Sequence, residues 1–131
     1  MHEILFRGKN IDDGHWTYGT PITLKNCETY MNFEFMGWID RALVIPETIG
    51  QYTGLTDKYG KRVFEGDILS GQLDDLFPTE ESRYEVIWHD YGWHIKDNSG
   101  MDTADKKWIK QYFKVIGNIY DNPELMGEGG K

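Results

Sequence analysis

Short runs in which apolar and polar residues alternate constrain the fold of this chain more than any other feature of its sequence. In the segment 29–35, this alternation places Met31, Phe33 and Phe35 on one face. The segments 84–88 and 93–96 are also rich in β-branched and aromatic residues, and they flank a short turn sequence. A period of two residues fits a strand and not a helix, so these segments predict paired strands.

Most other segments favour strands as well. Residues 4–9 and 15–24 lie on either side of Asp12-Asp13-Gly14, whose composition is typical of a turn, and they predict a hairpin. Further strand-forming segments are 38–39, 43–45, 51–55, 62–64, 68–70 and 114–120. Residues 46–49 predict a turn or one helical turn, and residues 106–113 fit a short helix or a short strand. We therefore expect an all-β protein with about ten strands; the pattern does not distinguish a barrel from a sandwich.

The remaining segments predict loops. Residues 71–82 form an acidic loop, residues 97–105 form a polar loop, and the tail 127–131 is expected to be disordered. At 131 residues, the chain fits one domain or two small lobes. A chain of this size buries roughly two-thirds of its surface on folding, so it needs no disulfide or metal for stability.

Location is predicted from what the sequence lacks. No apolar run approaches the ~18 residues of a membrane helix, and the N-terminus has no signal-peptide pattern. The single cysteine, Cys27, cannot form an intramolecular disulfide, and we expect it to be buried in a protein from a reducing compartment. These features predict a cytoplasmic protein that does not contact membranes.

Four segments, taken in order along the chain, resemble the YopX family. They are Ile4-Leu5-Phe6-Arg7-Gly8-Lys9 with Trp16-Thr17-Tyr18-Gly19; Pro46-Glu47-Thr48-Ile49-Gly50-Gln51-Tyr52-Thr53-Gly54-Leu55; Asp57-Lys58-Tyr59-Gly60-Lys61 with Phe64-Glu65-Gly66-Asp67-Ile68; and Val115-Ile116-Gly117-Asn118-Ile119-Tyr120-Asp121-Asn122-Pro123-Glu124-Leu125. Residues 20–44 and 71–112 carry no family motif.

The resemblance implies an SH3-like small barrel preceded by an N-terminal β-meander, with at most one short helix. We accordingly expect an N-terminal lobe at 1–55, a barrel lobe at 56–126 and the tail at 127–131. The resemblance also implies a phage or prophage protein that acts in the cytoplasm of a bacterial host. It implies no reaction, so no catalytic residue is carried over.

The family motifs contain groups that could do chemistry, but turn formation explains them better. Glu65 and Asp67 flank Gly66, a spacing that could serve acid–base catalysis or bind a cation, whereas Asp beside Gly also forms tight turns. Gln51, Tyr52 and Thr53 could form a recognition surface or make internal hydrogen bonds. The motif residues that we interpret as structural are Gln51, Tyr52, Gly54, Asp57, Gly60, Glu65, Gly66, Asp67, Asn118, Asn122 and Pro123.

Two other clusters are candidate binding sites. His89, Asp90, His94 and Asp97 share one hairpin, but two histidines without a fixed third ligand are a weak zinc signal, so no metal or cofactor is predicted. The only basic and aromatic cluster lies between residues 106 and 114. It contains Lys106, Lys107, Trp108, Lys110, Tyr112, Phe113 and Lys114, and it could bind a partner or a single nucleic-acid strand.

The sequence therefore favours a non-catalytic module that binds a protein partner or another copy of itself as a homo-oligomer. An aromatic content of 15% on a small β scaffold with open strand edges supports this hypothesis. The alternative is a nucleic-acid-binding protein that uses the cluster at Lys106 to Lys114, although a net charge of −8 weakens its attraction to phosphates. No enzyme motif is present, so we do not predict an enzyme.

Overall fold

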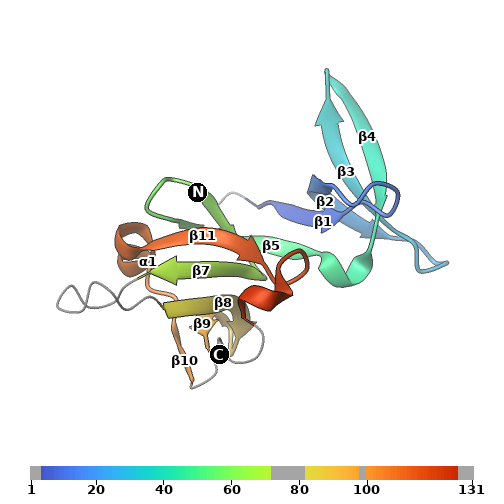
Figure 1. The fold of residues 1–131 in the computed structure, drawn as a ribbon. Coiled ribbons are helices and arrows are strands. Elements are labelled where there is room, and N and C mark those ends of the chain that lie inside the picture. Colours follow the sequence, from blue (N-terminus) through green and yellow to red (C-terminus); the bar gives the residue numbers. More distant parts are fainter. Residues whose placement is uncertain (1–3, 72–81, 98–99, 127–131) are drawn as a thin grey trace. The chain divides into compact units, whose positions relative to one another are not determined.

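The computed structural model describes residues 4–71, 82–97 and 100–126, and within these ranges the chain is mostly β (Figure 1). The strands are β1 (Phe6–Lys9), β2 (Trp16–Thr23), β3 (Thr29–Phe35), β4 (Trp38–Val44), β5 (Gly50–Thr56), β6 (Arg62–Phe64), β7 (Asp67–Gly71), β8 (Ser82–His89), β9 (Gly92–Lys96), β10 (Met101–Thr103) and β11 (Phe113–Asn118). The helices are α1 (Lys106–Tyr112) and the 3-10 turns η1 (Pro46–Thr48) and η2 (Pro123–Leu125). The all-β prediction is confirmed.

The chain divides into two units, the first ending at Tyr52 and the second beginning at Thr53. The sequence placed the lobe boundary between residues 55 and 56. Strand β5 contains both positions. Most of the predicted acidic loop at 71–82, and the whole of the predicted tail at 127–131, lie outside the described residues.

The first unit is an antiparallel sheet in the order β4-β3-β2-β1-β5. The predicted N-terminal hairpin is confirmed, with Phe6 opposite Gly19 and Lys9 opposite Trp16. The core of this unit is small, and Met31 and Val44 are its fully buried apolar side chains. Turn η1 is tied to β1 because the Thr48 hydroxyl accepts a hydrogen bond from the Lys9 amide at 2.9 Å.

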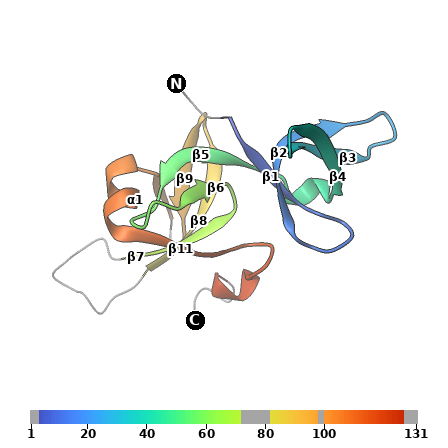
Figure 2. The same cartoon turned by 90° about the horizontal axis from the view of Figure 1, so that it is seen from above.

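The second unit is built on an antiparallel sheet in the order β10-β9-β8-β7-β11, while the later part of β5 pairs with β6. Figure 2 shows α1 leading into β11 within this unit. The buried residues of the core are Leu55, Val63, Leu69, Tyr84, Val86, Ile95, Ile109 and Phe113. Burying each aliphatic side chain stabilises the fold by about 1.5–3 kcal/mol.

The β8–β9 hairpin, predicted from its alternating pattern, is present, with Val86 opposite Ile95 and Trp88 opposite Trp93. Its two-residue turn has φ values of 49° at Asp90 and 62° at Tyr91. Positive φ at both central positions is the type I′ geometry that matches the twist of paired strands. The turn therefore keeps Val86 on the buried face of the sheet.

Three local expectations were corrected or resolved. The predicted polar loop 97–105 contains a strand, β10, which pairs with β9 between Met101 and Lys96. The ambiguous segment 106–113 is a helix that ends where Phe113 begins β11. Cys27 is exposed, so its predicted burial was wrong: it occupies the turn between β2 and β3 with φ 70°. The SH3-like barrel implied by the resemblance stays a prediction.

Candidate functional site

The outer part of the β3–β4 hairpin extends beyond the strands that support its base. Strand β2 pairs with β3 only from Thr29 to Asn32, whereas β4 pairs with β3 along its full length to Phe35. Residues 33–40 thus form a two-stranded ribbon within the described sheet; we call it the β3–β4 ribbon (Figure 1). Two strands alone are marginally stable in water, so a ribbon of this kind usually needs a further surface to pack on.

The β3–β4 ribbon exposes large apolar side chains. Phe35 is 57% exposed, Met36 84%, Trp38 77% and Ile39 78%. Phe35 and Trp38 are opposite each other beside the turn that holds Met36, and Ile39 is exposed on the other face, so the apolar patch covers both faces of the ribbon's tip. Contiguous exposed apolar groups on a folded protein mark interaction surfaces.

The two faces of the ribbon differ in chemistry. Phe33 lies opposite Asp40 and Phe35 opposite Trp38, which places all four on one face, because directly paired and alternate strand residues share a face. We call these four residues the aromatic face. Glu34 and Ile39 are opposite each other on the other face.

The second exposed surface lies on α1. Asp105 begins the helix, its carboxylate accepting hydrogen bonds from the amides of Lys107 at 2.9 Å and Trp108 at 3.0 Å. Ile109 is fully buried and fixes the inner side of the helix. Since successive residues turn by about 100°, the side opposite Ile109 is left to the solvent.

The residues predicted as a basic and aromatic cluster surround the rest of the helix: Lys107 lies opposite Ile109, Trp108 and Lys110 lie on its two flanks, and Lys106 lies about 60° from Ile109. Lys106, Lys107 and Lys110 are exposed, and Trp108 is 47% exposed; we call these four residues the α1 face. Tyr112 is partly buried against the core cluster, and Phe113 belongs to that cluster. The aromatic residues of the predicted cluster are therefore divided, with Trp108 outside and Phe113 inside.

Asp57, one of the motif residues, is a buried carboxylate whose two oxygens bind backbone amides. One oxygen accepts from Tyr59 and Lys61, both at 2.9 Å. The other accepts from Val115 at 2.9 Å, 58 positions along the chain. Asp57 is only 2% exposed. It thus joins the β5–β6 loop to β11, and its oxygens point into the protein and not toward a ligand.

Asp67 is a second buried motif carboxylate and is 1% exposed. Its Oδ2 accepts a hydrogen bond from the Phe64 amide at 2.7 Å across the β6–β7 turn. Gly66 has φ 90° and its absent Cβ would lie 3.2 Å from the Tyr120 ring. Glu65 is half-buried in the same turn. Asp beside Gly in a tight turn commonly accepts backbone hydrogen bonds of this kind.

Asn118, Asn122 and Pro123 form the turn that follows β11. The Asn118 side chain accepts hydrogen bonds from the amides of Tyr120 at 3.0 Å and Asp121 at 2.9 Å. The Asn122 side chain accepts in return from the Asn118 amide at 3.3 Å, and Pro123 opens η2. These side chains satisfy the backbone as the chain leaves the sheet.

The other motif residues lie on or beside β5. Gln51 is opposite Phe6, and the Tyr52 amide donates to the Leu5 carbonyl at 2.7 Å. The Thr53 hydroxyl donates to the Val63 carbonyl at 2.8 Å, which is a hydrogen bond inside the fold. The turn glycines Gly54 and Gly60 have φ values of 85° and 80°.

The histidine-bearing hairpin holds no metal-ligand cluster in the described part of the chain. The rings of His89 and His94 lie edge to face with centroids 5.7 Å apart, and His89 Nε2 lies 3.5 Å from Asp90 Oδ2. Within residues 4–71, 82–97 and 100–126, no three acidic, histidine or cysteine side chains converge on one point.

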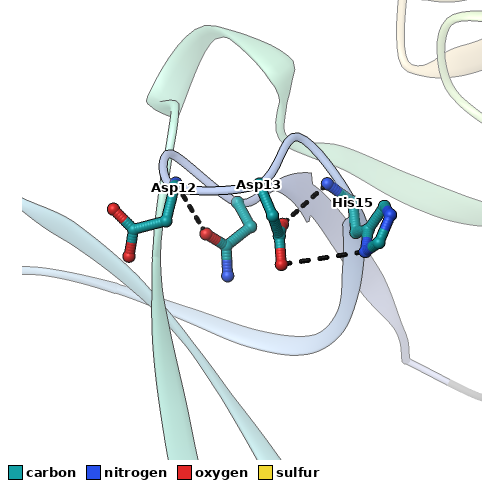
Figure 3. A network of polar contacts seen from close by, with 4 residues as sticks. Asp12, Asp13 and His15 are labelled. Atoms are coloured by element: carbon teal, nitrogen blue, oxygen red, sulfur yellow. Dashed lines mark hydrogen bonds and ion pairs between the residues drawn. The ribbon is translucent and has the colours of Figure 1, made fainter.

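A polar network also occupies the β1–β2 turn (Figure 3). The Asp12 amide donates to Asn10 Oδ1 at 2.8 Å and the His15 amide donates to Asp13 Oδ1 at 2.9 Å. Asp13 Oδ2 lies 3.7 Å from His15 Nδ1, with both side chains mostly exposed. These contacts shape the turn, and we assign them no further role.

The β3–β4 ribbon was missed as a site at the level of sequence. Its alternation placed Phe33 and Phe35 on one face with Met31, but the sequence does not show where the neighbouring strand ends. A usable signal was present, however: Phe35-Met36-Gly37-Trp38-Ile39 places apolar residues on both sides of a turn, where polar residues are the rule.

Comparison with known proteins gives a family match and two similar solved structures. The family model described as YopX protein matches residues 5–127. Protein EF1440 from Enterococcus faecalis has a similar structure, with a TM-score of 0.65 at 22% identity over 96% of this chain and 99% of that chain. Protein yopX from Bacillus subtilis gives a TM-score of 0.58 at 17% identity, over 96% and 97% of the two chains. No curated protein matches at a significant level.

Among the residues that the structure describes, none of the helices has the length and apolar character needed to cross a bilayer.

Proposed function

The chain belongs to the YopX protein family, and on this basis we propose that it is a non-catalytic binding or assembly module that contacts a protein through the β3–β4 ribbon. The observation that carries the proposal is the patch at Phe35, Met36, Trp38 and Ile39, each more than half exposed. Large apolar side chains at the centre of an interface supply most of its binding energy.

The turn of the ribbon supports this role. It has φ 52° at Met36 and 83° at Gly37, the type I′ geometry that holds two strands in register. Apolar groups on paired strands lose less conformational freedom on binding than groups on an unpaired chain. The contacts of Asp57 and Asp67, which occupy both carboxylates inside the fold, support a module without catalysis by these groups.

Site-specific photo-crosslinking tests the proposal. A benzophenone amino acid at Met36, which is 84% exposed, should crosslink to a discrete protein in cells that produce the chain. The matched control is the same group at Tyr59, 75% exposed on the second unit. A Trp38→Ser change should remove the Met36 product. No product at Met36, or an equal one at Tyr59, would refute the proposal.

Nucleic-acid binding is the second candidate, because Trp108 is half exposed beside three exposed lysines. A base stacked on Trp108 with phosphates near the lysines is a common way to hold a single strand. This function predicts salt-sensitive binding of a single-stranded oligonucleotide that is lost in Lys107→Glu/Lys110→Glu. Absence of binding at low salt would exclude it.

We also propose, from the family resemblance, that the protein is encoded on a phage or prophage and acts in the cytoplasm of a bacterial host. Fractionation of a host strain that carries the gene tests the location. Recovery of the protein outside the cytoplasmic fraction would contradict this proposal.

A further inference from the structure

The β3–β4 ribbon and the α1 face have complementary chemistry. The aromatic face of the ribbon carries one acidic residue, Asp40, while Glu34 lies on the other face. Residues 33–40 contain no lysine or arginine. The α1 face combines three exposed lysines with the exposed edge of Trp108. One surface is aromatic and acidic, and the other is aromatic and basic.

We propose that the aromatic face of the ribbon in one copy docks on the α1 face of a second copy, with Asp40 beside Lys107 and Lys110. This proposal rests on the proposed function and names the partner as the chain itself. Aromatic side chains would supply the buried centre of the contact, and the charge pairs would fix its orientation.

Charge decides against the symmetric alternative. Two aromatic faces packed on each other would place two Asp40 carboxylates in one contact with no lysine or arginine of these faces to pair with them, and unpaired like charges in a contact oppose binding. The lysines of α1 supply the opposite sign in a chain whose net charge is −8. The neighbouring Arg41 does not neutralise the aromatic face, because its guanidinium lies 4.6 Å from the Tyr30 ring, on the other side of the ribbon.

The contact joins two different surfaces, so each copy offers one of each. Such a head-to-tail interface closes into a ring or continues as a filament, depending on the rotation between copies. The association should therefore continue beyond a simple dimer as concentration rises.

Analytical ultracentrifugation of nuclease-treated protein over a wide concentration range tests the inference. The wild-type mass should rise with concentration, and Asp40→Lys or Lys107→Glu should each weaken association by about tenfold or more. The matched controls are Asp12→Lys and Lys25→Glu, which make the same charge changes at exposed turn positions. These controls should associate like the wild type.

Mixing the two single variants gives the decisive result. The Lys107→Glu copy retains a wild-type ribbon and the Asp40→Lys copy retains a wild-type α1 face, so a 1:1 mixture should form complexes that neither variant forms alone. A strict monomer, an unchanged Lys107→Glu variant, or no recovery on mixing would overturn the inference. A monomer that still gives the Met36 crosslink to another protein would leave the proposed function standing.

Discussion

At the scale of single residues, buried carboxylates hold the turns of the second unit. Asp57 is the clearest case, because its two oxygens accept hydrogen bonds from three backbone amides, those of Tyr59, Lys61 and Val115. Removing the carboxylate leaves three partly buried backbone amides without this acceptor. An unsatisfied amide of this kind costs more free energy than an ordinary hydrogen bond contributes.

Asp57→Ala should therefore lower the free energy of unfolding by about 3 kcal/mol. Asp57→Asn keeps one accepting oxygen and should cost about half as much. Urea denaturation followed by tryptophan fluorescence measures both changes. Asp12→Ala, at an exposed turn position, is the control and should stay within about 0.5 kcal/mol of the wild type. An Asp57→Ala protein as stable as this control would contradict the structural role.

Tyr91 is a residue whose backbone suits glycine better than tyrosine. It has φ 62° at the second position of the β8–β9 turn, and its side chain is 94% exposed. Tyr91→Gly should raise the free energy of unfolding by about 0.5–1 kcal/mol, since the left-handed conformation costs glycine little. Tyr91→Ala keeps the unfavourable φ and should change stability far less. If both variants lose stability in thermal unfolding, the exposed ring makes a contact that the fold does not show.

At the scale of elements, the strands were more predictable than the segments between them. The hairpins follow from period-two alternation, and Asp90 with Tyr91 forms the expected turn. The predicted loop 97–105 was wrong because β10 is short and all three of its residues are exposed, so no apolar alternation marks it. Cys27 was misplaced for a related reason: a small apolar side chain does not reveal whether a turn or a core holds it.

The candidate site was only partly predictable. The lysines of α1 were visible in the sequence as a cluster. Their spacing did not show that Trp108 is exposed and Phe113 buried, because this depends on the helix ending at Tyr112 and Phe113 beginning β11. The ribbon was not predicted, because the sequence does not show where β2 stops pairing with β3. In the structure this pairing ends at Asn32, which leaves Phe35 without a neighbouring strand on that side.

The turn after β11 gives a prediction at this scale. The Val115–Gly117 step interrupts the β11–β7 register, and a Cβ on Gly117 would collide with the Asn122 side chain that accepts the Asn118 amide. Gly117→Ala should cost about 1–3 kcal/mol because the turn must move or lose this bond. Gly100→Ala is the control, with open space at its Cβ. Equal stability of the two variants in urea denaturation would show that the turn adapts without cost.

At the scale of the whole molecule, the chain combines a well-packed second unit with a first unit whose core is small. Among the described residues, the second unit buries eight core residues in one cluster, whereas the fully buried apolar residues of the first unit are Met31 and Val44. A sheet with little core of its own gains stability when a partner covers its exposed part. The proposed binding role thus follows from the same imbalance that leaves the ribbon uncovered.

Two positions on one hairpin separate the ribbon's role in folding from its role in binding. Met31 is fully buried at the base of β3, and Met31→Ala should lower the free energy of unfolding by about 2–5 kcal/mol. Trp38 is 77% exposed on the ribbon, and Trp38→Ser should lower it by less than about 1 kcal/mol, the contribution of a cross-strand pair. Chemical denaturation at low protein concentration, where association is absent, compares the two directly. If Trp38→Ser were as destabilising as Met31→Ala, the ribbon would already be packed within one chain. The exposed patch would then be part of the fold, and both the binding proposal and the head-to-tail contact would lose their basis.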